Sequence, residues 1–240
     1  MSSEKMEKIN PLKKIENSLT KEQSFKIDEV FKDNPEIGTL FENNEKLFQE
    51  YLNDIFPESK VKDIVYHSTA TLFENYDIEK GDLGMHFSTK NVSSGILYSK
   101  YTKANLINIK NPLYFTDFGG FHFRMFGEKF VDANIINKDE FSMIDKMNLS
   151  VKEEDKLLRE LLLSRGYDGI IYLNRREGIN GGILNGDEFY KDKNLNDKEF
   201  KEKYPDASDS YIVFESEQIH IIDSQEDLKQ AKEWLKNKKL

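Results

Sequence analysis

The chain has 240 residues and a net charge of −9, from 35 Lys and Arg against 44 Asp and Glu. Its hydrophobic content of 38%, with 17 Phe and 11 Tyr, provides material for a sizeable core and excludes wholesale disorder. The acidic balance argues against a broad nucleic-acid-binding surface, and the absence of Cys excludes disulfides, thiolate metal sites and Cys nucleophiles.

The first 60 residues are predicted to form a helical extension, 1–60. Residues 1–19 are polar and rich in Lys and Glu, and they contain no apolar signal segment. Asn34-Pro35 fits an N-cap followed by proline at the first helical position. Apolar residues then recur at three- and four-residue steps, which indicates one amphipathic helix over 36–55. We expect that helix either to pack against the main domain or to bind a partner.

From residue 61 the pattern changes to short runs of β-forming residues, which indicates a main domain over 61–223. We expect strands at 64–66, 85–87, 104–109, 111–115, 169–173, 211–214 and 218–222. Helices are expected at 92–101 and 152–165, and the charged, Gly- and Asn-rich stretch 174–209 is expected to be a long loop. Residues 224–240 are predicted to form a C-terminal helix packed on the domain. The fold class is therefore α+β.

Polar and aromatic side chains beside the predicted strands could line a small-molecule site: His67, Ser68, Thr69, His86, Phe87, Ser94 and Tyr98. The imidazole of His67, at a strand end, could hydrogen-bond a ribose hydroxyl. His86-Phe87 offers flat rings for stacking, and Ser94 and Tyr98 share a helix face because they are four residues apart. Taken singly, each of these residues also fits a purely structural role.

No metal site and no membrane contact are expected. His122 and His220 lack metal-ligand spacing to other His residues, so no zinc site is supported. No apolar run approaches the length needed to cross a bilayer, and the expected location is cytoplasmic.

In their order along the chain, these segments resemble the ADP-ribosyltransferase fold. The matching residues are Tyr66-His67-Ser68-Thr69, Gly84-Met85-His86-Phe87-Ser88 with Gly95 and Tyr98, Asn111-Pro112-Leu113, the run from Gly166 to Asn174, and Tyr211-Ile212-Val213-Phe214 with Glu217-Gln218-Ile219. The chain looks most like the family found in polyvalent proteins of phages and mobile elements, and it is more distantly similar to poly(ADP-ribose) polymerases. The resemblance covers residues 61–222 and implies a split antiparallel β-sandwich with flanking helices.

The resemblance also implies that NAD binds, as a substrate, in a cleft between two small sheets. His67 matches the histidine that bonds the ribose, Ser68 the residue whose backbone holds the nicotinamide carboxamide, and His86 the ring that stacks on nicotinamide. The remaining cofactor contacts would come from Thr69, Phe87, Ser94 and Tyr98. The implied reaction is loss of nicotinamide through an oxocarbenium-like state, followed by transfer of ADP-ribose to a macromolecular acceptor, expected to be a protein.

The third catalytic position departs from the family. Where the polymerases have a Glu before their Tyr-Ile-Val strand, this chain has Ser210, whose hydroxyl can bond the ribose but carries no charge. Asp209, Glu217 or Gln218 could compensate, although regular strand alternation puts Asp209 on the face opposite Ser210. The predicted catalytic residues are therefore His67, Ser210 and Glu217.

Two other functions stay open at this point. One is a module on the same fold that binds NAD or a related ligand without turnover, which the uncharged Ser210 and the unusual His86 favour. The other is an interaction protein that keeps the fold as a scaffold, which the amphipathic helix over 36–55 favours.

Overall fold

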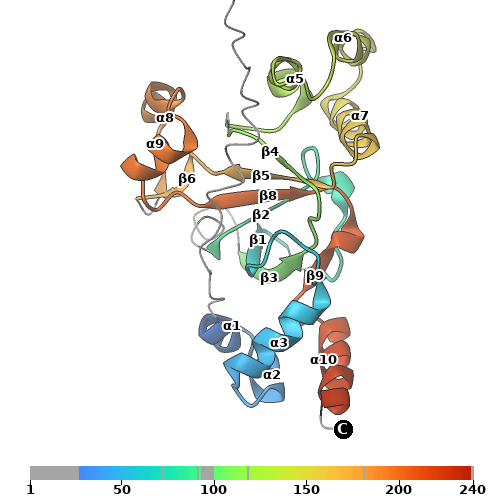
Figure 1. Cartoon of the computed structure of the whole chain (residues 1–240), viewed down its shortest axis with the longest axis vertical. Helices are drawn as coiled ribbons and strands as arrows, with labels where there is room; N and C mark the ends of the chain where they lie inside the picture. Colours follow the sequence, from blue (N-terminus) through green and yellow to red (C-terminus); the bar gives the residue numbers. More distant parts are fainter. Residues whose placement is uncertain are drawn as a thin grey trace, which may run out of the picture.

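The computed structural model describes residues 27–71, 73–90, 92, 100–117, 119–180 and 182–238. Within these residues, seven strands form one sheet: β1 (Val65–Thr69), β2 (Met85–Ser88), β3 (Tyr101–Ile107), β4 (Pro112–Tyr114), β5 (Gly169–Leu173), β8 (Asp209–Val213) and β9 (Ile219–Ile221). Their order across the sheet is β4–β5–β8–β2–β1–β3–β9 (Figure 1). The predicted α+β class is confirmed.

Seven strands of the described residues form one mixed sheet, so the expected split antiparallel sandwich is not confirmed. β4 and β5 pair in parallel, whereas the other neighbouring strands pair antiparallel. β1 and β2 share a single register pair, Tyr66 with Ser88, while β1 and β3 are paired from Val65 to Thr69. The sheet is therefore joined narrowly between a β4–β5–β8–β2 part and a β1–β3–β9 part.

Two groups of helices pack on these two parts of the sheet (Figure 1). The first group is α1 (Ile27–Asp33), α2 (Pro35–Leu40), α3 (Glu45–Ile55) and α10 (Gln225–Lys238), and the second is α5 (Phe123–Asp132), α6 (Lys138–Lys146) and α7 (Val151–Ser164). Phe48 of α3 belongs to one core with Tyr66 of β1, and Leu158 of α7 belongs to another with Ile212 of β8. In the part of the chain that is described, no helix combines the length and apolarity needed to cross a bilayer.

The single helix predicted over 36–55 is wrong, because the chain forms α2 and α3 with a turn between them. Glu42 and Asn43 adopt left-handed φ angles of 53° and 52°, which a continuous helix does not allow. Asn44 then begins α3, and its side chain accepts a hydrogen bond from the Leu47 amide at 3.1 Å. The apolar side of α3 is buried against the rest of the chain, which agrees with the expectation that this segment packs on the main domain. Binding of a partner by this helix stays a prediction.

A buried carboxylate connects the N-terminal helices to the C-terminal helix. Asp227 of α10 is fully buried, and its Oδ1 accepts a hydrogen bond from the Tyr51 hydroxyl at 2.5 Å. The Nε2 of His220 lies 2.7 Å from the same oxygen, and the Asp223 amide donates to Oδ2 at 2.8 Å. Ser224 caps α10 by accepting from the Asp227 amide at 3.1 Å. The described parts of segments 1–60 and 224–240 thus share one core.

The long loop predicted over 174–209 is wrong, because the stretch folds into an insertion of β6 (Glu177–Ile179), β7 (Gly182–Ile183), α8 (Gly186–Asp192) and α9 (Asp197–Lys203). Its small core contains Leu173, Ile179, Leu184, Phe189, Phe200, Tyr204 and Ala207. Asn185 and Asn196 cap α8 and α9, accepting from the amides of Glu188 and Glu199 at 3.0 Å each. The asparagines that suggested a loop are therefore helix caps.

Two glycines allow the strands beside β8 to approach it closely. A Cβ on Gly84, just before β2, would lie 2.3 Å from the carbonyl oxygen of Val213. A Cβ on Gly169 of β5 would lie 2.7 Å from the carbonyl oxygen of Ile212. Both neighbours of β8 thus need glycine where the backbones meet, which fixes the position of the residues that follow on β2.

Candidate functional site

Four side chains form one row across the middle of the sheet. Tyr66 pairs with Ser88, Ser88 with Ser210, and Ser210 with Tyr172. Directly paired residues point to the same face of a sheet, so the row runs along one face. Tyr66 belongs to the core of the N-terminal helices and Tyr172 to the core of α5–α7. The two serines therefore lie between the strands on which the two groups of helices pack.

His67 lies where β1 and β2 part. Its Nδ1 is 2.9 Å from the carbonyl oxygen of His86, and because a carbonyl only accepts, Nδ1 carries the proton. The ring is surrounded by Phe73, Tyr76 and Phe87, with centroids at 6.0, 5.3 and 5.8 Å. Burial lowers the pKa of His67, so the ring is neutral near pH 7 and its Nε2 is an acceptor.

Ser68 and Thr69 continue β1 beyond His67. The Ser68 hydroxyl lies 3.1 Å from the Thr102 hydroxyl of β3, and the Thr69 hydroxyl donates to the carbonyl of Thr71 at 3.0 Å. Both side chains are half-buried beside His67. The other two residues predicted to contact a cofactor, Ser94 and Tyr98, lie outside the described residues.

His86 and Phe87 point to opposite faces of the sheet. The Nε2 of His86 is 3.0 Å from the carbonyl oxygen of Asp82, and its ring centroid is 6.1 Å from that of Phe121. Burial lowers the pKa of His86 below its ordinary value. Phe87 is 2% exposed in the core of the other face, with its ring centroid 5.4 Å from that of Tyr76. The two rings are thus separated, and only Phe87 lies beside His67.

Ser210 and Glu217 are not brought together. Ser210 is 1% exposed at the centre of the row, and its Oγ accepts a hydrogen bond from Nδ2 of Asn174 at 3.2 Å. Glu217 is exposed in η4 (Ser216–Gln218), which follows the opposite end of β8, and its carboxylate accepts from the Ser216 hydroxyl at 3.2 Å. A strand length therefore separates the two positions.

The other two compensating residues considered from sequence also face elsewhere. Asp209 is in regular strand beside Ser210 and so points to the opposite face, as predicted. There, burial and the charge of Asp209 raise the pKa of Asp63 to about 6. Gln218 is buried, and its side-chain oxygen accepts from the amides of Phe214 and Glu215 at 3.0 and 2.9 Å. It therefore holds the turn after β8.

Sequence reasoning missed a carboxylate next to Ser210. Asn174 follows β5 and is 2% exposed, and its Nδ2 donates both to Ser210 Oγ and to Oε2 of Glu177, the latter at 2.9 Å. Its Oδ1 accepts from the amides of Arg176 and Glu177 at 3.0 and 2.8 Å. The available signal is an Asn at a strand end with a Glu three residues later, within the stretch predicted to be a loop.

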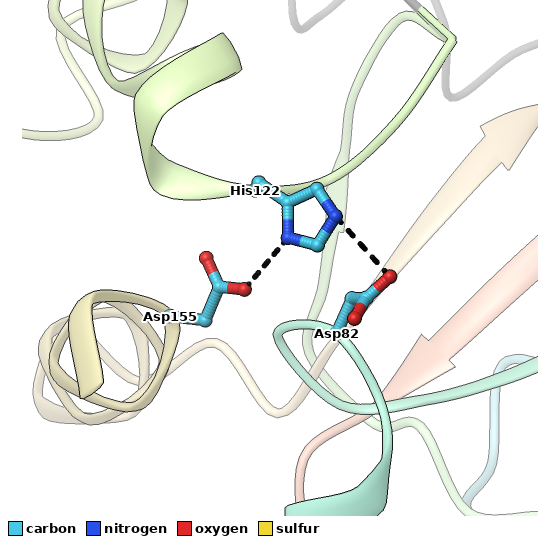
Figure 2. Close-up of side chains that lie close together, drawn as sticks. All are labelled: Asp82, His122 and Asp155. Carbon is cyan, nitrogen blue, oxygen red and sulfur yellow. Dashed lines mark hydrogen bonds and ion pairs between the residues drawn. The ribbon is translucent and has the colours of Figure 1, made fainter. Parts of the chain in front are cut away.

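A second missed cluster has the composition of a metal site. His122, Asp82 and Asp155 have ligand atoms within 4.8 Å of one another. In Figure 2 the imidazole lies between the two carboxylates, with Nδ1 2.9 Å from Asp155 Oδ2 and Nε2 3.4 Å from Asp82 Oδ2. The other Asp155 oxygen accepts from the Phe123 amide at 2.8 Å. Because the carboxylates face different ring nitrogens, this geometry suits a bridging imidazolium better than a bound metal.

No family model, curated protein or solved structure matches this chain.

Proposed function

We propose that the protein is an NAD-dependent mono-ADP-ribosyltransferase, which releases nicotinamide and transfers ADP-ribose to a macromolecular acceptor. The observation that carries this proposal is the position of His67 where β1 and β2 part. An ADP-ribosyltransferase fold places NAD between two parts of a divided sheet, with a histidine of the first strand at the ribose. The narrow join at Tyr66 and Ser88 supports that arrangement.

The protonation of His67 suits contact with a ribose. Its Nδ1–H is held by the His86 carbonyl, so Nε2 accepts and a ribose hydroxyl can donate to it. The hydrogen bond also fixes the ring orientation, as partners of catalytic histidines do. The flanking rings of Phe73 and Tyr76 limit its movement.

A neutral His86 suits the nicotinamide side of NAD. The nicotinamide ring of NAD is a cation, and a protonated imidazole beside it would repel the substrate. Burial lowers the pKa of His86, which favours the uncharged ring. A flat, neutral imidazole can then stack where relatives use tyrosine.

The insertion after β5 is the proposed contact surface for the acceptor. It begins at Asn174, next to Ser210, and α8 and α9 project beyond the sheet at one side (Figure 1, orange). Tyr190 and Ile183 on this insertion are 67% and 44% exposed. Exposed apolar side chains beside a reaction site suit recognition of a protein better than of nucleic acid, in a chain of net charge −9.

The test is nicotinamide release from NAD by the purified protein, alone and with cell lysate as the source of acceptor. We expect release by the wild type and its loss in His67→Ala. His67→Asn is the matched variant, because its amide can still donate to the His86 carbonyl but offers no acceptor at the Nε2 position. We expect it to keep the wild-type melting temperature and to lose turnover. Absence of nicotinamide release under both conditions would contradict the proposal.

A second function is favoured by Ser210. This uncharged residue is 1% exposed and occupies the position where polymerases have their catalytic Glu, which suits a module that binds NAD without turnover. Titration calorimetry separates the two functions. NAD binding without nicotinamide release would support the module, and absence of binding would exclude both.

A further inference from the structure

The proposed reaction needs negative charge beside His86, where the nicotinamide ring is proposed to stack. His86 shares the Ser210 face of the sheet, because it is two residues from Ser88, the partner of Ser210, and Ser210 itself supplies no charge. Cleavage of the bond between nicotinamide and ribose builds positive charge on the ribose ring, which a fixed carboxylate stabilises. Asp209 points to the opposite face, and Glu217 lies beyond the far end of β8. A carboxylate that supplies this charge must therefore belong to another residue on the Ser210 face.

Glu177 is the carboxylate that the fold brings there. It begins β6, and Asn174 connects it to Ser210 through the two hydrogen bonds of one amide nitrogen, at 2.9 and 3.2 Å. Of the two Glu177 oxygens, Oε2 accepts the bond from Asn174. The other oxygen, Oε1, accepts no hydrogen bond from the residues that the structure describes. The Glu177 side chain is half-buried. One oxygen is thus anchored while the other is available to a ligand.

The backbone around Glu177 is held in place. Its own amide donates to Asn174 Oδ1 at 2.8 Å, and the preceding Arg175 amide donates to buried Asp117 at 2.8 Å. Gly178 has a φ of +72°, and a Cβ there would lie 2.6 Å from Cγ2 of Val92. This hairpin start therefore has little freedom to carry the carboxylate away from Ser210.

The charge of Glu177 reaches the neighbouring side chains of the site. Burial raises the pKa of Tyr172, the partner of Ser210 in the row, and the charges of Asp117 and Glu177 raise it further. The same carboxylate opposes the effect of burial on the pKa of His86. Glu177 therefore acts electrostatically on both the Ser210 and the His86 side of the site.

We propose that Glu177 is a catalytic residue that replaces the carboxylate missing at position 210, an inference that rests on the proposed ADP-ribosyl transfer. Its Oε1 binds a hydroxyl of the ribose attached to nicotinamide, and Asn174, which also bonds Ser210, positions it. The bond between ribose C1′ and the nicotinamide nitrogen breaks, and the electron pair leaves with neutral nicotinamide. A lone pair of the acceptor, or of water, then bonds to C1′, and the acceptor's proton passes to solvent through the Glu177 carboxylate.

The test compares three Glu→Gln variants of the full chain with the wild type. Glu177→Gln removes the charge but keeps a side-chain oxygen for Asn174. Glu160→Gln is the control, because this residue is exposed on α7, outside the insertion. Glu217→Gln tests the carboxylate favoured by sequence. The measurements are nicotinamide release from NAD, NAD affinity by calorimetry, and melting temperature.

We expect Glu177→Gln to lower kcat by about 100-fold, while NAD affinity stays within about threefold of wild type and melting temperature is unchanged. The other two variants should retain wild-type turnover. Wild-type turnover in Glu177→Gln would overturn the inference and leave the proposed function standing, as would a parallel loss of affinity and melting temperature, which would mark a structural role. A wild type that binds NAD but releases no nicotinamide would overturn both.

Discussion

The hydrogen bond between Tyr51 and Asp227 offers a direct measure of how firmly the N-terminal helices are joined to the rest of the chain. Tyr51→Phe removes only the hydroxyl, whose oxygen lies 2.5 Å from Asp227 Oδ1. The ring itself keeps its contacts with Phe41 and Trp234, at centroid distances of 5.3 and 5.6 Å. The variant therefore isolates one buried hydrogen bond to a carboxylate.

The expected loss in the free energy of unfolding depends on the hydrogen-bond partners that Asp227 keeps in the variant. Burial and the adjacent Asp227 raise the pKa of Tyr51, so the phenol stays a proton donor under all working conditions. A hydrogen bond to a charged group contributes about 1.5–3 kcal/mol. Asp227 keeps His220 and the Asp223 amide, so it is not left without partners and the lower end applies. We expect a loss of about 1.5–2 kcal/mol, or about 3–8 °C in melting temperature.

The assay is urea denaturation of wild type and variant, followed by circular dichroism and by Trp234 fluorescence. Tyr190→Phe is the matched control, because this tyrosine is 67% exposed, and it should stay within about 0.5 kcal/mol of wild type. A free energy of unfolding for Tyr51→Phe equal to that of the control would refute the reasoning. A transition seen by fluorescence alone would show that the helices unfold separately from the sheet.

Two further predictions concern His122 and Gly84. Partial burial lowers the pKa of His122, but the hydrogen bond to Asp155 and the charges of Asp82 and Asp155 outweigh it, and the pKa lies above the ordinary 6.5. The protonated His122 ring stabilises the folded chain fully below the unfolded-state pKa, and this contribution is lost as pH rises through the folded-state pKa. Wild type should therefore lose more free energy of unfolding than His122→Gln above pH 6.5. Equal slopes of the free energy of unfolding against pH for the two proteins would contradict this. Gly84→Ala should cost about 1–3 kcal/mol, because its Cβ would lie 2.3 Å from the Val213 carbonyl. Gly186→Ala, with nothing within 4 Å, should be near neutral, and equal melting temperatures for the two would count against the close approach.

The strands were predictable where the local pattern decides the outcome. The run 169–173 is apolar, follows a glycine and forms β5 with the expected bounds. The break between α2 and α3 at Glu42 and Asn43 was not predictable, because the hydrophobic periodicity continues across it while the backbone turns. Helices α5 and α6 were not predicted, because their apolar residues acquire a clear partner only when they pack beside α7.

The site was predictable as separate residues but not as an assembly. His67 and the carbonyl of His86 are near each other because they are on adjacent strands. Ser210 lies beside Ser88 because β8 lies between β2 and β5, a strand order that no local pattern encodes. Glu177 was missed for the same reason, since its link to Ser210 depends on Asn174 at the end of β5.

The contact between Tyr51 and Asp227 joins residues 176 positions apart in the chain. At about 5–20 residues per second, a ribosome needs about 9–35 s to make the intervening chain. During that interval α3 lacks α10, and its apolar side, with Phe48 and Leu52, lacks part of its final cover. Docking of the first helices is therefore a late step of folding in the cell, and a chain shortened before α10 would present that apolar side to chaperones.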